Sequence, residues 1–160
     1  MRYVLCKKGL RNVSENVNNL IKKEINLGLD KVSTYKQFKV DCELSKDKIK
    51  SLLKKLKNEG KKIVGYGATS KSTTILNYCK IGPELIDFIS DTTPIKQNKY
   101  TPGMHIPVKP YEDFLKYNPQ IAVLFAWNHR KEIENKEKLF IENGGKFISH
   151  ISWFLLFIVQ

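Results

Sequence analysis

Cysteine is scarce in this sequence, and its spacing excludes two classes of protein. The three cysteines, Cys6, Cys42 and Cys79, lie far apart and form no C-x-x-C pair. A disulfide framework or a zinc site needs more cysteines, or closer ones. The sequence therefore predicts neither, nor any other metal site, and it favours a reducing, cytoplasmic location.

Arginine is equally scarce, with only Arg2, Arg11 and Arg130, although the formal net charge is +12. Almost all of the positive charge is lysine. Lysine spread over helices is typical of a solvated face, whereas proteins that recognise base sequence favour arginine. We therefore prefer a solvated lysine surface and keep a basic nucleic-acid-binding protein as an alternative. The excess charge should still attract anionic small molecules, nucleotide diphosphates included.

A long apolar run is also missing. Residues 1–8 lack the apolar stretch of a signal peptide. Residues 151–159 are strongly apolar, but about 20 residues are needed to cross a bilayer. We therefore predict no membrane contact. The apolar tail, residues 153–160, is interpreted as a buried strand or as a segment that seeks a partner surface.

The first 60 residues predict a helical lead-in. Residues 2–6 suit a short strand, and apolar residues from Val13 recur at helical spacing until Gly28. A second helix should begin at Ser45 as its N-cap and end at Gly60. We expect residues 1–60 to pack on the main domain.

Strands and helices alternate from Lys61 onward. This pattern predicts a Rossmann-like α/β domain over residues 61–152, with a doubly wound, mostly parallel sheet. The expected strands are 63–66, 85–90, 105–108, 121–126 and 147–151, and the expected helices are 70–79, one after Pro110, and one that ends near Asn143.

The first of these strands continues into a glycine loop, Gly65-Tyr66-Gly67-Ala68-Thr69-Ser70-Lys71. Glycines allow the backbone to approach a phosphate, and the N–H groups of a helix N-terminus attract anions. The spacing departs from G-x-G-x-x-G, because Ser70 occupies the third position, and it is not a P-loop. We interpret the segment as a phosphate or ligand loop. A tight turn without a ligand remains the alternative.

Three further segments follow strand ends or lie beside the expected cleft. Asp91 ends the second strand, where Rossmann domains place an acid that binds ribose. Trp127 and Asn128 end the buried strand and offer stacking and hydrogen bonding. The polar loop from Lys96 to His105 carries a Pro-Gly turn. For His105 we favour a hydrogen-bonding or structural role over that of a general base.

Several segments together resemble the carboxy-terminal domain of the sugar C-methyltransferases. They are Val64–Cys79, Ile81–Asp87, Asp91–Gln97, Tyr100–Pro107 and Ala126–Asn128. These S-adenosylmethionine-dependent enzymes methylate ring carbons of nucleotide-linked sugars. The resemblance covers roughly residues 1–148. It implies a Rossmann-like domain that holds a nucleotide-diphosphate sugar against a central methyltransferase domain.

The resemblance also implies which residues face that cleft. They are Gly65, Tyr66, Gly67, Ala68, Thr69, Ser70, Lys71, Ser72, Asn77, Asp91, Lys96, Gln97, Tyr100, Thr101, Pro102, Gly103, His105, Trp127 and Asn128. The family's zinc cysteines and its methyltransferase domain have no counterpart here.

We therefore expect a thymidine- or cytidine-diphosphate sugar as the ligand, with no catalytic residue in this chain. S-adenosylmethionine is implied only for the missing domain, and a separate methyltransferase chain is a candidate partner. The alternative of a stand-alone NAD(P)-binding oxidoreductase is disfavoured by the glycine spacing.

Overall fold

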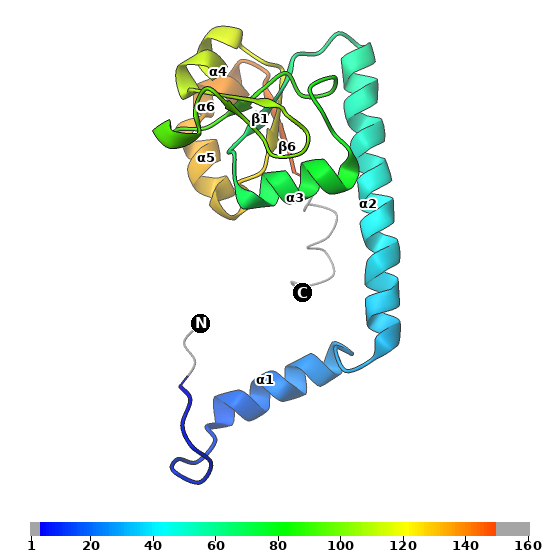
Figure 1. The fold of residues 1–160 in the computed structure, drawn as a ribbon, viewed down its shortest axis with the longest axis vertical. Helices are drawn as coiled ribbons and strands as arrows, with labels where there is room; N and C mark the ends of the chain where they lie inside the picture. Colours follow the sequence, from blue (N-terminus) through cyan, green and yellow to red (C-terminus); the bar gives the residue numbers. More distant parts are fainter. Residues whose placement is uncertain (1–3, 150–160) are drawn as a thin grey trace. The chain divides into compact units, whose positions relative to one another are not determined.

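The structure, a computed structural model, describes residues 4–149 and separates into two compact units between Cys42 and Glu43 (Figure 1). In chain order the elements are α1 (Glu15–Asn26), α2 (Val32–Asn58), β1 (Ile63–Tyr66), α3 (Ser70–Cys79), β2 (Ile89–Ser90), η1 (Pro94–Lys96), β3 (Lys99–Tyr100), β4 (Pro107–Lys109), α4 (Tyr111–Tyr117), β5 (Ile121–Leu124), η2 (Trp127–His129), α5 (Arg130–Lys136), α6 (Lys138–Glu142) and β6 (Lys146–Ile148).

The first unit contains α1 and the beginning of α2. Ser14 has the extended backbone of an N-cap before α1, but its side chain makes no capping hydrogen bond. The prediction of a strand at residues 2–6 is wrong for residues 4–6, which form no strand. A short apolar run becomes a strand only beside a hydrogen-bonding partner, and the sheet contains no such partner for it.

The helix α2 is longer than expected. Ser45 lies inside it rather than at its N-cap, because the helix already begins at Val32. Residues 32–58 contain neither glycine nor proline, so nothing in this stretch breaks the hydrogen-bond ladder. Residues 32–44 and the helix expected from Ser45 are therefore one element.

The second unit is a Rossmann-like α/β domain, as the alternation of elements predicts. Its sheet has six strands in the order β3-β4-β2-β1-β5-β6. All neighbouring pairs are parallel except β3 with β4. After β1 the chain moves outward to β2 and β4, then crosses back to β5 on the other side of β1. Such a switch point is where open α/β sheets bind ligands.

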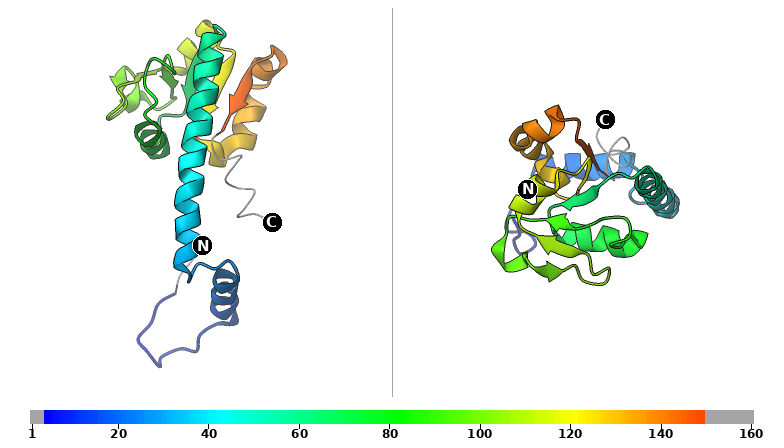
Figure 2. Two further views of the ribbon diagram at one scale, coloured as in Figure 1. Left: turned by 90° about the vertical axis from the view of Figure 1, so that its right-hand side faces the viewer. Right: turned by 90° about the horizontal axis from the view of Figure 1, so that it is seen from above.

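Two apolar clusters cover the two faces of this sheet. Helices lie on both sides of the sheet (Figures 1 and 2). On β1 and β5, Ile63 and Val123 lie in one cluster, whereas Val64 and Leu124 lie in the other. This alternation follows the two-residue period of a strand. The first cluster includes side chains of α2 and α3, and the second includes side chains of α4, α5 and α6. Both faces are thus buried, which explains the continuous apolar run of β5.

Several strand boundaries differ from the prediction. The run from Leu85 to Ser90 is buried except for Asp87, but only Ile89 and Ser90 form β2. The N–H groups of Leu85 and Ile86 both donate to the carbonyl of Gly82, so the chain turns there instead of extending. Short β3 lies in the stretch expected to be irregular, because it pairs with β4.

The last part of the domain contains shorter elements than expected. The predicted charged helix is divided into η2, α5 and α6, and the last described strand ends at Ile148.

Residues 153–160, the apolar tail, lie outside the described residues. Within residues 4–149, no helix has both the length and the apolar composition that a membrane crossing requires.

Candidate functional site

The carboxyl ends of β1, β2 and β5 lie side by side and carry the candidate site. At the end of β1, the N–H of Gly67 donates to the carbonyl of Ser90, at 2.8 Å, which ties the glycine loop to β2. Gly67 has a φ of 91°, a conformation that disfavours every side chain. Gly65 is a glycine for another reason. A Cβ at this position would lie 2.8 Å from Ile89 Cγ1 and 2.9 Å from Phe125 Cε2, so Gly65 serves core packing.

Asp91 clamps the glycine loop. One carboxylate oxygen accepts the N–H of Ala68 at 2.7 Å, and the other accepts the N–H of Thr93 at 2.8 Å. The ammonium of Lys96 lies 3.4 Å away. Burial raises the pKa of the Asp91 carboxyl, but the hydrogen bonds from Thr93 and Ala68 and the charge of Lys96 outweigh it and hold the pKa below its ordinary value. A loop N–H group expected to face a phosphate thus already has a carboxylate partner.

The N-terminus of α3 is partly capped by the chain itself. Thr69 Oγ1 accepts the N–H of Ser72 at 3.1 Å, and Ser72 Oγ donates to the Thr69 carbonyl at 2.6 Å. Within residues 4–149, no acceptor is bonded to the N–H of Ser70 or of Lys71. These two amides therefore remain available to an anion.

The segment of residues 96–105 is anchored to α3. Asn77 Nδ2 donates to the carbonyl of Pro102 at 2.9 Å. Gly103 has a φ of 80°, and a Cβ there would collide with Asn77. Gln97 Nε2 donates to the Asp91 carbonyl at 3.0 Å. His105, with a φ of 53°, lines neither of the two cavities described below. Asn77, Gln97 and Gly103 thus hold the segment in place.

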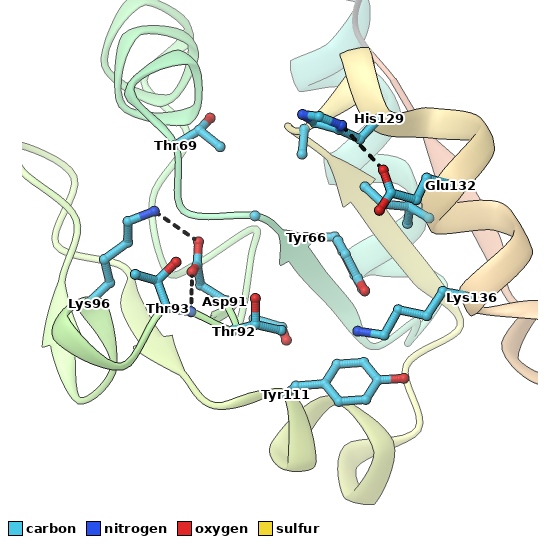
Figure 3. A pocket seen from close by; sticks show the side chains of 14 residues that line it. Tyr66, Thr69, Asp91, Thr92, Thr93, Lys96, Tyr111, His129, Glu132 and Lys136 are labelled. Carbon is cyan, nitrogen blue, oxygen red and sulfur yellow. Dashed lines mark hydrogen bonds and ion pairs between the residues drawn. The ribbon is translucent and has the colours of Figure 1, made fainter.

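A cavity of about 470 Å³ opens at the strand ends, and we call it the tyrosine cavity (Figure 3). Its lining residues come from β1 and β2, from the segments that follow β1, β2 and β5, and from the start of α4. They are Tyr66, Gly67, Thr69, Ser90, Asp91, Thr92, Thr93, Lys96, Tyr111, Ala126, His129, Glu132, Ile133 and Lys136.

A buried carboxylate lies behind one end of the tyrosine cavity. Glu137, only 3% exposed, accepts the hydroxyl proton of Tyr66 at 2.7 Å and that of Tyr111 at 2.9 Å. The ammonium of Lys136 lies 3.8 Å from Glu137 and 3.8 Å from the centre of the Tyr111 ring. Burial is the larger cause and the hydrogen bond to Glu137 the smaller cause of a raised pKa at both tyrosines. The pKa of Tyr111 is raised to about 12, and that of Tyr66 is raised further. Both hydroxyls are therefore protonated at neutral pH.

A second cavity, of about 270 Å³, lies beside the glycine loop, and we call it the lysine hollow. It is lined by Ala68, Thr69, Ser70, Ser72, Thr73, Ile95, Lys96, Lys99, Tyr100, Thr101, Pro102 and Val108. Thr69 and Lys96 line both cavities. The two spaces therefore adjoin at the start of α3.

The structure divides the residues that the sequence singled out. Five of them line the tyrosine cavity, namely Tyr66, Gly67, Thr69, Asp91 and Lys96. Thr69 and Lys96 also line the lysine hollow, together with Ala68, Ser70, Ser72, Tyr100, Thr101 and Pro102. Lys71 donates to Asn128 Oδ1 at 3.0 Å and lies 4.8 Å from the Trp127 ring. The residues that line neither cavity are Gly65, Lys71, Asn77, Gln97, Gly103, His105, Trp127 and Asn128.

Sequence reasoning singled out Tyr66 but missed Tyr111, Lys136 and Glu137. Tyr111 begins the helix that follows β4, so the rule that ligands bind at strand ends contained a usable signal. Lys136 and Glu137 lie in a charged helical stretch whose pattern carries no such signal. In the described part of the chain, no three His, Cys, Asp or Glu side chains gather as a metal site would need.

Comparison with known proteins identifies the family. Residues 1–152 match the family model described as the C-methyltransferase C-terminal domain. The chain is 37% identical over 132 residues to the C-methyltransferase NovU of Streptomyces niveus. The match covers 82% of this chain and 31% of NovU, so the chain spans less than a third of this relative. The chain belongs to the C-methyltransferase C-terminal domain family.

Proposed function

We propose that this chain is the nucleotide-sugar-binding domain of a sugar C-methyltransferase system. The observation that carries the proposal is the pair of adjoining cavities at the switch point of the sheet. In an open α/β sheet this edge is where ligands bind. The combined space is of the size that small-molecule sites use, and hydroxyl, carboxylate and ammonium groups line it.

The composition of the site suits a ligand that joins an anion to a hydroxyl-rich group. Lys96 and Lys99 supply positive charge in the lysine hollow, which is also lined by Ser70, one of the two α3 residues with an unbonded amide. Thr69, Thr93 and Tyr111 supply hydroxyl groups. A nucleotide-diphosphate sugar has both kinds of group, and its diphosphate would also gain from the net charge of +12.

In this proposal the chain binds and orients the sugar, and the methyl donor binds elsewhere. Carbon methylation needs a methyl donor, which the family resemblance indicates is S-adenosylmethionine. We assign no residue of this chain to that molecule. The methyltransferase domain would be supplied by a longer form of the protein or by a separate chain.

Calorimetric titration of the chain with a thymidine-diphosphate hexose, and with its cytidine counterpart, tests the proposal. We expect measurable heat, and a Lys96→Met variant should bind more weakly because Lys96 lines both cavities. Lys146→Met is the matched control, since Lys146 is an exposed strand lysine that lines neither cavity. An absence of heat at millimolar ligand would overturn the proposal.

A further inference from the structure

The two cavities differ in their charge. In the tyrosine cavity every cation has a carboxylate beside it. Lys96 lies near Asp91, Lys136 lies near Glu137, and His129 Nδ1 lies 3.5 Å from Glu132. An anion that entered this cavity would have to compete with these three carboxylates.

The tyrosine cavity also presents hydrogen-bond acceptors where Tyr66 and Tyr111 line it. The hydroxyl protons of Tyr66 and Tyr111 are both donated to Glu137, so their oxygens offer only lone pairs to a ligand. A phosphate oxygen needs donors and finds none in these two hydroxyls. A sugar hydroxyl, in contrast, can donate to them.

The rings of the two tyrosines leave little room for a stacked base. Tyr111 has the ammonium of Lys136 over its ring and the Phe114 ring stacked at 6.0 Å. Tyr66 is 8% exposed and makes edge contacts with Phe114 and Phe147. Base stacking needs an open aromatic face. A sugar ring therefore fits this end of the cavity better than a nucleobase does.

The lysine hollow has the opposite character. Its lining includes no carboxylate, and besides Lys96, which Asp91 pairs, it includes Lys99. Asp91 does not line this space, although it is bonded to Ala68 and Lys96, which do. Within residues 4–149, the ammonium of Lys99 forms no ion pair, so its charge remains available.

We propose that the ligand is divided between the cavities, with its uncharged sugar ring in the tyrosine cavity and its diphosphate in the lysine hollow. The two parts would meet at Thr69 and Lys96, which line both spaces. Glu137 is then a positioning residue, because it acts through the tyrosine hydroxyls. This inference rests on the proposed function and assigns the parts of its ligand.

Calorimetry with two probes tests the division. The first is thymidine diphosphate, and the second is the same nucleotide linked to a 6-deoxyhexose. Lys99→Met should weaken both probes roughly fivefold, because both carry the diphosphate. Tyr111→Phe should weaken only the sugar-linked probe, also roughly fivefold, which is the size of one neutral hydrogen bond. A purely structural role of Tyr111 would change both probes alike.

Four results would overturn the inference. Tyr111→Phe could weaken both probes equally, which would place the nucleoside in the tyrosine cavity, or it could leave both unchanged. Lys136→Met could weaken thymidine diphosphate more than Lys99→Met does, which would place the diphosphate there. If the unmodified chain binds thymidine diphosphate but not the sugar-linked probe, the division fails. Binding of neither probe removes the proposed function itself. Lys146→Met and the melting temperature of each variant control for folding.

Discussion

The two units of this chain use the same kinds of residue with different results. In the first unit, α1 carries Val17, Leu20, Ile21 and Ile25 on one side, yet each is more than 40% exposed and no residue of α1 is buried. In the second unit, Leu53 of α2 is fully buried in an apolar cluster. An amphipathic pattern therefore forms a helix in both places, but only neighbouring side chains determine whether the pattern contributes to stability.

A pair of leucine substitutions tests this difference between the two units and has the largest expected effect. Leu53→Ala should lower the free energy of unfolding by about 3 kcal/mol, because it leaves a cavity in the core. Leu20→Ala, on a half-exposed surface, should change it by no more than about 0.5 kcal/mol. Urea denaturation followed by circular dichroism measures both. Equal losses would show that α1 is as tightly packed as α2.

A pair of glycine substitutions compares core packing at Gly65 with that at Gly82 in the second unit. Gly65→Ala should cost about 2 kcal/mol, because its Cβ would press on the Ile89 side chain and the Phe125 ring in the core. Gly82→Ala should cost less, since the nearest atom there belongs to the flexible end of Glu84. The same denaturation experiment compares them. A larger loss at Gly82 would contradict the packing role of Gly65.

The acid sensitivity of the second unit tests whether Asp91 clamps the loop. The pKa of Asp91 is lowered in the folded state, so its stabilising effect is present above the unfolded pKa and is lost as the pH falls through the folded pKa. Asp91→Asn should cost about 1 kcal/mol at neutral pH and flatten the acid side of the stability profile. Unfolding measured from neutral to acidic pH checks this. An unchanged profile would show that another carboxyl controls it.

The smallest effect should come from the surface of the second unit. Lys71 donates to Asn128 and lies over Trp127, but it is exposed. Lys71→Met should therefore change the free energy of unfolding by no more than about 0.5 kcal/mol. The fluorescence of Trp127 should nevertheless respond, since the ammonium lies 4.8 Å from its ring. A loss of unfolding free energy as large as that of Leu53→Ala would show that side-chain exposure does not explain the difference between Leu20 and Leu53.

The sequence by itself determined the local part of the site. The strand at Ile63–Tyr66 and the helix at Ser70–Cys79 have the bounds that their apolar pattern predicts. Asp91 directly follows its strand, as expected. These features depend on periodicity and on backbone conformations that neighbouring residues set, so they can be inferred from short segments. The fold class followed from the order of the elements.

Only the tertiary structure decided what these residues contact. It joined Asp91 to the N–H of Ala68, brought Glu137 to Tyr66 across 71 positions of the chain, and divided the polar residues between two cavities. Whether two distant segments form a hydrogen bond depends on how the sheet and its helices pack, and no local sequence pattern encodes that packing. Glu137 looks like any other acid of a charged helix until α5 and α6 pack on the sheet.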